Sequence, residues 1–174
     1  MYLRHLYPAP KSFCEDESVR FCFGAHVMAR VSGLSPDCAE RVRALWHRFC
    51  CDASDLTCIP AGDGFCFTVG EAYAELSDGD CCAIHADASG VSVTAVDEAS
   101  LLYGIETLVQ LICPVDLTEG REAFYISSAE VHDAPAIPFR AVHFCIFPDT
   151  KLYNVEKAIC LAGFFKMTHV ILEF

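Results

Sequence analysis

The chain has 174 residues, with 24 acidic against 12 basic side chains and a net charge of -12. This acid excess repels phosphate backbones and anionic lipid, so nucleic acids and membrane surfaces are not expected partners. With 53% apolar and 21% charged residues, the chain can bury a real core, which argues against disorder. No apolar stretch reaches the ~18 residues of a membrane-spanning helix, and residues 1–14 lack the apolar core of a signal peptide. We expect a cytoplasmic protein, or a secreted one whose leader has been trimmed.

Twelve cysteines are the next unusual feature. Many lie inside apolar runs such as residues 21–23 and 65–67, so we expect buried thiols and no disulfide scaffold. The close pairs, Cys50–Cys51 and Cys81–Cys82, are adjacent and lack the C-x-x-C type of spacing that holds zinc. The chain also has no phosphate-binding glycine loop, nucleophile elbow or helical zinc motif. We therefore predict no metal site and no cofactor.

In chain order, residues 1–18 indicate an entering loop, and residues 20–31 alternate apolar and polar side chains as a strand does. Ser35 then precedes Pro36 as an N-cap precedes a helix. The helix that follows has one apolar stripe, made by Cys38, Val42, Leu45, Trp46 and Phe49.

Further on, short strands are predicted over residues 65–69 and 81–86, with a turn at 78–80. Ser89-Gly90 then turns the chain into a hairpin strand over 91–95. The clearest helix runs over residues 97–112, capped by Asp97. Gly104 inside this helix costs about 1 kcal/mol relative to alanine, so we expect it where the helix approaches the sheet closely. A last strand over 125–131 ends at Asp133-Ala134-Pro135.

Two domains follow from these elements. Residues 1–136 indicate an α+β fold, a mostly antiparallel sheet with two helices on one face. Residues 137–174 change to a strand over 141–147, a helix over 152–166 and a strand over 169–174, which is typical of a parallel βαβ unit. The helix is expected to turn inward Val155, Ala158, Ile159 and Ala162. Two strands do not form an independent sheet, so this unit is docked on the first domain or belongs to something longer.

Two segments resemble a known family. Gly104, Thr107, Leu108, Gln110 and Leu111 match the "Gly-x-x-Thr-Leu-x-Gln-Leu" helix of the domain that precedes the barrel in glycoside hydrolase family 20, the β-N-acetylhexosaminidases. The segment from Asp133 through Pro135 to Arg140 is similar to the family's "Asp-x-Pro-x-x-x-x-Arg-Gly" approach to the first barrel strand, and residues 6–10 resemble the start of that domain. The resemblance implies an accessory domain over 1–136 and the first strand, helix and strand of a (β/α)8 barrel over 137–174.

The resemblance also implies what the chain lacks. In that family the 2-acetamido group of the substrate is the nucleophile, and an Asp-Glu pair well beyond residue 174 holds it and supplies the acid. No catalytic residue is therefore expected here. Arg140 is the one functional residue that carries over, as a donor to sugar hydroxyls; the alternative is a surface arginine on a linker. Ala141 replaces the family's glycine and Cys145 its strand aspartate, so the implied parent is a divergent relative or another barrel glycosidase such as family 84.

Three functions remain open. The first is the inactive accessory part of a family 20-like glycosidase that acts on N-acetylhexosamine glycosides, with self-association through the open strand at 170–172. The second is a stand-alone carbohydrate-binding or protein-interaction module. The third is a small enzyme that uses a cysteine, or Glu173 with Asp149 as an acid-base pair.

Overall fold

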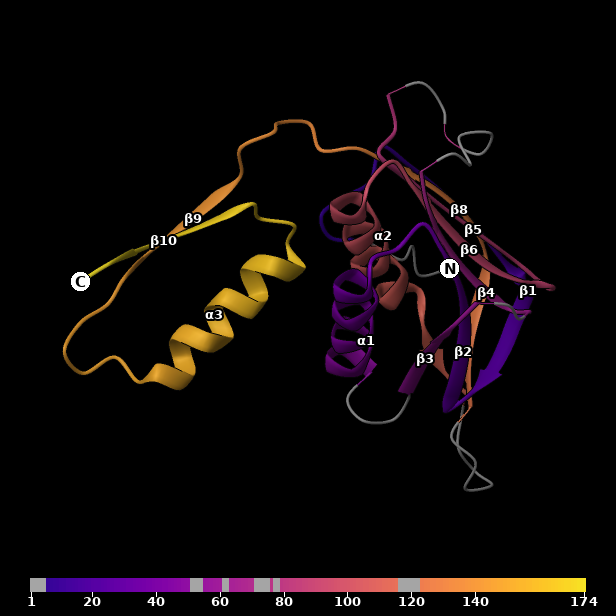
Figure 1. The fold of residues 1–174 in the computed structure, drawn as a ribbon, viewed down its shortest axis with the longest axis horizontal. Helices are drawn as coiled ribbons and strands as arrows, with labels where there is room; N and C mark the ends of the chain where they lie inside the picture. Colours follow the sequence, from indigo (N-terminus) through magenta and orange to yellow (C-terminus); the bar gives the residue numbers. More distant parts are fainter. Residues whose placement is uncertain (1–5, 51–54, 61–62, 71–75, 77–78, 116–122) are drawn as a thin grey trace. The chain divides into compact units, whose positions relative to one another are not determined.

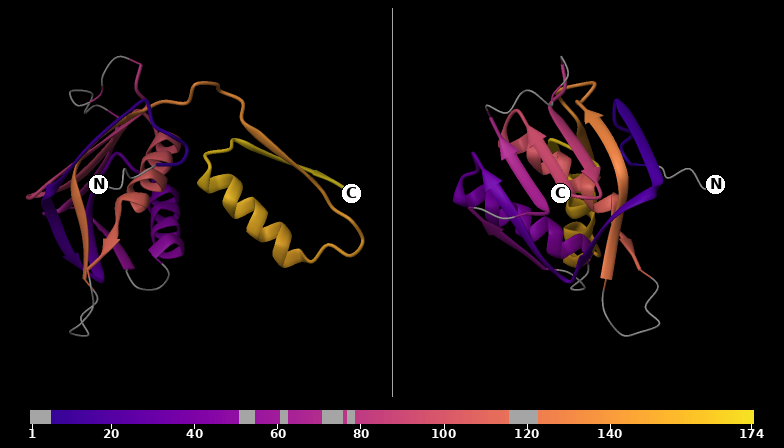
Figure 2. Two further views of the ribbon diagram at one scale, coloured as in Figure 1. Left: turned by 180° about the vertical axis from the view of Figure 1, so that it is seen from behind. Right: turned by 90° about the vertical axis from the view of Figure 1, so that its right-hand side faces the viewer.

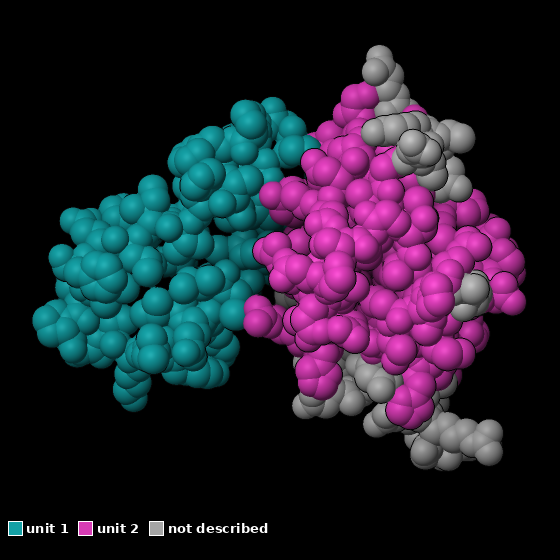
Figure 3. Space-filling model, in the orientation of Figure 1, with its two compact units in different colours: residues 1–9, 135–174 teal, residues 10–134 magenta. Residues whose placement is uncertain are grey.

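A computed structural model describes the chain except for residues 1–5, 51–54, 61–62, 71–75, 77–78 and 116–122 and a few side chains beside those gaps. The chain divides into two compact units, coloured separately in Figure 3. Residues 10–134 form what we call the sheet unit. Residues 1–9 and 135–174 form what we call the strand–helix–strand unit.

The sheet unit contains one eight-stranded mixed sheet (Figure 1). Its strands are β1 (Ser12–Gly24), β2 (His26–Ser32), β3 (Asp55–Ile59), β4 (Phe65–Val69), β5 (Cys82–Asp87), β6 (Gly90–Ala95), β7 (Cys113–Pro114) and β8 (Ala123–Asp133). They lie in the order β1-β8-β5-β6-β4-β2-β3, and β7 also pairs with β8. The pairs that involve β8 and the β5–β6 hairpin are antiparallel, whereas β2–β3, β2–β4 and β4–β6 are parallel. The predicted α+β fold with a mostly antiparallel sheet is confirmed.

Two helices, α1 (Pro36–Cys50) and α2 (Glu98–Leu111), cover one face of this sheet (Figure 2). Both begin at the predicted caps: the Ser35 hydroxyl accepts from the Cys38 amide at 3.2 Å, and the Asp97 carboxylate accepts from the Ser100 amide at 2.7 Å. Helix α2 packs on β4, β5 and β6, and α1 packs on α2 and β3. The core between these layers includes Val42, Trp46, Phe67, Ile84, Leu101, Ile105 and Leu108.

Gly104 lies where α2 meets the sheet. A methyl group added at its Cα would stand 2.7 Å from Cγ1 of Val93 on β6 and 3.7 Å from Cβ of Cys82 on β5. The predicted close approach of helix and sheet at this residue is therefore confirmed. The local cost of glycine in a helix is offset by the tight packing that it permits.

The predicted strand over 20–31 is wrong in its extent. Strand β1 begins at Ser12, inside the predicted loop, and ends at Gly24, while β2 starts at His26. Strand β1 pairs with β8, whereas β2 pairs with β3 and β4 in another part of the sheet. The two-residue alternation continues across Ala25, so the sequence pattern does not reveal the break.

The prediction that the cysteines are buried holds for only some of them. Cys38 and Cys82 are buried, but Cys14, Cys22 and Cys145 are exposed, and none of the ten described cysteines forms a disulfide. A strand turns successive side chains to opposite faces, so an apolar neighbour such as Phe21 or Phe23 sends Cys22 outward. The apolar neighbours of Cys22 in the sequence therefore led to a wrong prediction of burial for this residue.

The strand–helix–strand unit consists of β9 (Ala141–Cys145), α3 (Leu152–Phe164) and β10 (His169–Glu173). The two strands are parallel and pair in register from Ala141 with His169 to Cys145 with Glu173, as the βαβ pattern predicts. On α3, Ala162 is buried, but Ile159 is 42% exposed, so its predicted inward position is wrong. Two strands are too narrow to cover the whole apolar stripe. Among the described helices, none combines the length and apolarity that crossing a bilayer requires.

Candidate functional site

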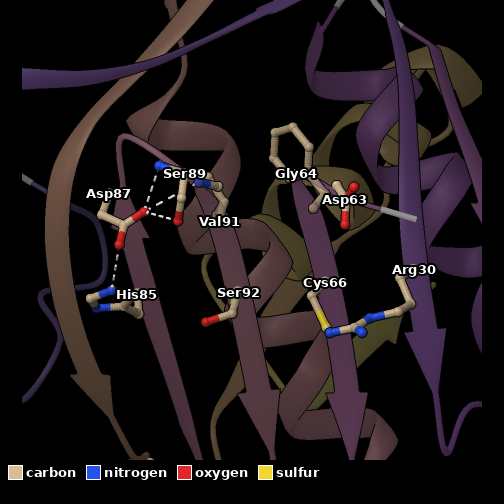
Figure 4. A pocket seen from close by; sticks show the side chains of 11 residues that line it. Arg30, Asp63, Gly64, Cys66, His85, Asp87, Ser89, Val91 and Ser92 are labelled. Carbon is tan, nitrogen blue, oxygen red and sulfur yellow. Dashed lines mark hydrogen bonds and ion pairs between the residues drawn. The ribbon is translucent and has the colours of Figure 1, made fainter. Parts of the chain in front are cut away.

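The face of the sheet opposite α1 and α2, which we call the open face, has polar side chains aligned across several strands. Strand register places Glu130 of β8 beside His85 of β5, His85 beside Ser92 of β6, and Ser92 beside Cys66 of β4. Cys66 in turn lies beside Arg30 of β2. Figure 4 shows His85, Ser92, Cys66 and Arg30 as a row across the ribbon.

A groove of about 270 Å³ follows this row. At one end, residues 89–90 turn the β5–β6 hairpin, and the Val91 amide donates to the Gly64 carbonyl at 2.7 Å. A side chain at Gly90 would lie 2.3 Å from that same carbonyl oxygen, so the close approach requires glycine. The polar side chains that line the groove are Arg30, Asp63, Cys66, His85, Asp87, Ser89 and Ser92.

The acidic end of the groove is held by hydrogen bonds. One oxygen of Asp87 accepts from the Ser89 amide at 2.7 Å, from the Ser89 hydroxyl at 2.6 Å and from the Gly90 amide at 3.2 Å. The Ser89 donors lower the pKa of Asp87 to about 2. Its other oxygen lies 3.5 Å from Nε2 of His85. Asp87 is therefore a fixed anion at the edge of the groove.

His85 links the groove to a longer polar network. Its Nδ1 lies 2.7 Å from Glu130, and this hydrogen bond is the largest cause of a raised pKa at His85. Glu130 also meets Nε2 of His132 at 3.2 Å, and Nδ1 of His132 lies 2.9 Å from Asp80. The Asp80 side chain is 1% exposed and pairs with Lys11 at 2.5 Å. A buried carboxylate requires charged or hydrogen-bonding partners. The contacts of Asp80 with Lys11 and His132 therefore stabilise the fold.

The basic end of the groove is formed by Arg30, whose Nη2 donates to Sγ of Cys66 at 3.1 Å. This contact is the main cause of a raised pKa at Arg30. The groove thus offers a guanidinium, an imidazole, a thiol, two carboxylates and two serine hydroxyls on one surface. Such a set can hydrogen-bond a ligand rich in hydroxyl groups.

Arg140, the predicted sugar-binding residue, lies just before β9 and is half-buried. Its Nε donates to the Lys166 carbonyl at 2.8 Å and its Nη1 to the Ile137 carbonyl at 2.6 Å. Its backbone amide meets the Thr168 hydroxyl at 3.0 Å. Lys166 has a φ of 58°, in the left-handed region, so the Arg140 side chain fastens the turn where α3 leads into β10.

Glu173 lies at the carboxyl end of β10, and its contacts are with β9. Its Oε2 lies 3.1 Å from Nε2 of His143 and accepts from Sγ of Cys145 at 3.6 Å. The structure therefore brings Glu173 together with His143 and Cys145, and the pairing of Glu173 with Asp149 stays a prediction. Sequence reasoning missed this grouping, although the period-two position of His143 and Cys145 on a parallel strand was available as a signal.

Comparison with solved structures places this geometry in a known fold. No family model and no curated protein matches the sequence. A family 20 exo-β-N-acetylglucosaminidase from Vibrio harveyi, in complex with N-acetylglucosamine, aligns over 99% of the chain with a TM-score of 0.76 and 15% identity. The fold is that of a segment of family 20 enzymes. A β-N-acetylhexosaminidase from Streptomyces plicatus gives a TM-score of 0.74 at 20% identity over 99% of the chain. One from Bacteroides fragilis gives 0.70 at 18% identity over 97%.

The chain spans only about a quarter to a third of these proteins: 26% of the Vibrio enzyme, 34% of the Streptomyces enzyme and 33% of the Bacteroides enzyme. The resemblance to family 20 expected from the helix at 102–112 and the segment at 133–140 thus agrees with the fold. At identities this low, the match concerns the fold alone. The ligand bound by the Vibrio enzyme is therefore a property of that enzyme and does not identify a ligand of this chain.

Proposed function

We propose that the chain is the N-terminal, non-catalytic part of a divergent family 20-like glycoside hydrolase that acts on N-acetylhexosamine glycosides. The observation that carries the proposal is the fold match over 97–99% of the chain, which includes both units. Residues 137–174 are then the first strand, helix and strand of the catalytic barrel. The Asp-Glu pair implied by the resemblance belongs to a later barrel strand.

The surroundings of Glu173 support inactivity of this stretch by itself. Its side chain is 64% exposed. Glycosidase active sites enclose their acid groups in a pocket. The exposed position of Glu173 supports the proposal that this stretch has no glycosidase activity by itself.

The strand–helix–strand unit exposes a large apolar surface, which supports its place in a larger barrel. Soluble monomers rarely expose apolar side chains in such numbers on a single small unit. We infer that neighbouring barrel elements cover them in the parent protein. When those barrel elements are absent, we propose that the open edge of β10 drives self-association of the chain. The large apolar side chains of this unit that are at least half exposed are Tyr7, Ile137, Phe139, Phe147, Leu152, Tyr153, Leu161 and Phe174.

Arg140 is the residue that we propose for sugar contact in that parent. Its contacts with the carbonyls of Ile137 and Lys166 fix the guanidinium at the start of β9. A guanidinium carries five donors in a rigid plane, so one side chain can serve several acceptors. In this proposal Arg140 both fastens the turn and presents donors to sugar hydroxyls.

The test is the coding sequence that follows codon 174 in the gene. The proposal predicts an open reading frame of several hundred further codons, with an Asp-Glu dipeptide on a later apolar strand. A stop codon directly after Phe174, confirmed on the messenger RNA, would contradict it. A continuing frame that encodes an unrelated fold would do the same.

The groove on the open face favours a second function, that of a carbohydrate-binding or protein-interaction module. We infer sugar as the ligand because the groove is lined by hydrogen-bonding side chains from four adjacent strands. Calorimetric titration with N-acetylglucosamine oligomers tests this. Binding that Arg30→Ala with His85→Ala abolishes, and that Met28→Ala on the same strand as Arg30 leaves intact, supports the module. An absence of heat with every oligomer rules out these sugars as ligands.

A further inference from the structure

The carboxyl ends of β9 and β10 place three metal-ligating side chains on the same face of the strand pair. His143 and Cys145 are two residues apart on β9, and Glu173 pairs in register with Cys145. Their neighbours Val142 and Phe144 point the other way and line a cavity against α3. The three polar side chains therefore lie on the face opposite the helix, where no residue of α3 competes for them.

Their ligand atoms are already gathered. His143 nitrogen, Cys145 sulfur and a Glu173 carboxylate oxygen all lie within 4.8 Å of one another. The same Oε2 atom of Glu173 lies 3.1 Å from Nε2 of His143 and 3.6 Å from Sγ of Cys145. A tetrahedral zinc ion with ordinary bond lengths would separate nitrogen from oxygen by about 3.4 Å, and sulfur from oxygen by about 3.6 Å. The two separations from the Glu173 oxygen are thus close to those of a tetrahedral site, and the nitrogen and sulfur, within 4.8 Å of each other, can close on the ion by side-chain rotation.

The donor set selects the kind of metal. Imidazole, thiolate and carboxylate together suit a borderline divalent cation, whereas magnesium and calcium prefer oxygen donors only. We propose that His143, Cys145 and Glu173 bind one Zn²⁺ ion, with a fourth coordination position left open to water. Binding displaces the thiol proton of Cys145 to solvent, so the affinity falls as the pH is lowered. The site does not depend on any glycosidase activity.

The main competing explanation is a set of ordinary surface hydrogen bonds, in which Glu173 accepts from His143 and from the Cys145 thiol with no metal present. In that explanation the reactivity of the Cys145 thiol does not depend on zinc. The metal site instead requires Cys145 to be ionised and covered when zinc is present. The reactivity of this one thiol therefore distinguishes the two.

The experiment is alkylation of the whole chain with iodoacetamide, with and without added Zn²⁺, followed by mass spectrometry of the peptides. Each of the twelve cysteines is measured in the same sample, so other thiols act as internal controls. We expect zinc at about ten times its dissociation constant to slow alkylation of Cys145 about tenfold, because only the fraction of chains without the metal presents a free thiolate to the reagent. Cys14 and Cys22, which are exposed on β1, should react at unchanged rates.

Variants complete the test. His143→Gln and Glu173→Gln should each remove most of the protection of Cys145. His85→Gln, which alters an exposed histidine with carboxylate partners in the sheet unit, should leave it intact. Circular dichroism checks that each variant is folded. The proposal is overturned if zinc does not slow the alkylation of Cys145 by iodoacetamide in the native chain. It is also overturned if the protection by zinc persists in both His143→Gln and Glu173→Gln.

Discussion

At the scale of single residues, His85 makes the stability of the sheet unit depend on pH. The hydrogen bond that His85 donates to Glu130 raises the pKa of His85 in the folded chain above its ordinary value of 6.5. The resulting stabilisation is complete below pH about 6.5 and is lost as the pH rises through the folded pKa. Because His85 is about half exposed, solvent screens the effect and keeps it small.

We therefore expect the urea concentration at the midpoint of unfolding to fall slightly as the pH is raised from below 6.5 to 8. The fall should be smaller in the Glu130→Gln variant. The His85 pKa itself is measured by nuclear magnetic resonance titration of the ring protons. Glu130→Gln should lower it, while Glu15→Gln on β1 serves as a control. A His85 pKa that Glu130→Gln leaves unchanged would show that the hydrogen bond does not cause the shift.

Arg140 permits a second prediction at this scale. Arg140→Ala removes the donors to the Lys166 carbonyl, in the turn between α3 and β10, and to the Ile137 carbonyl before β9, which should cost about 1–3 kcal/mol of local stability. Hydrogen exchange of the β10 amides measures this loss. Lys157→Ala removes a cation that lies over the exposed Tyr153 ring in the same unit, and should stay within about 0.5 kcal/mol of the native chain. If the two substitutions lower the local stability equally, Arg140 does not stabilise the turn between α3 and β10.

At the scale of elements, the contact of α2 with the sheet depends on Gly104. Gly104→Ala would place a methyl group 2.7 Å from Val93 Cγ1, which overpacks the core and should destabilise the sheet unit by about 1–3 kcal/mol. Gly163→Ala is the matched control, because its added Cβ meets nothing within 4 Å near the end of α3. That substitution should stabilise α3 by up to about 1 kcal/mol. Denaturation curves that show no loss in Gly104→Ala would contradict the close packing.

Elements were also the level at which the sequence was most informative. The caps Ser35 and Asp97 and the hairpin at Ser89-Gly90 depend on local chemistry, so they could be predicted. The break at Ala25 could not, because the choice of β8 or of β3 and β4 as partners is made by the tertiary fold. The grouping of Cys145 with Glu173 was missed for the same reason: the residues lie 28 positions apart, and only strand register joins them.

At the scale of the whole molecule, we expect the chain to self-associate. Among the described strands, β10 pairs with β9 alone, and its apolar residues Ile171 and Leu172 are exposed. An uncovered apolar strand edge can template pairing with another chain. Sedimentation velocity should show species above the mass of the monomer, reduced by Ile171→Lys but not by Met28→Lys on β2. A single monomer peak at high concentration would contradict this.

The central claim is that these 174 residues form a non-catalytic part of a family 20-like glycosidase. Its most direct test is an assay of the purified chain with a chromogenic N-acetyl-β-glucosaminide. The account predicts release of the chromophore at the rate of buffer alone, in the native chain and in Glu173→Gln alike. Turnover by the native chain that Glu173→Gln abolishes would contradict it.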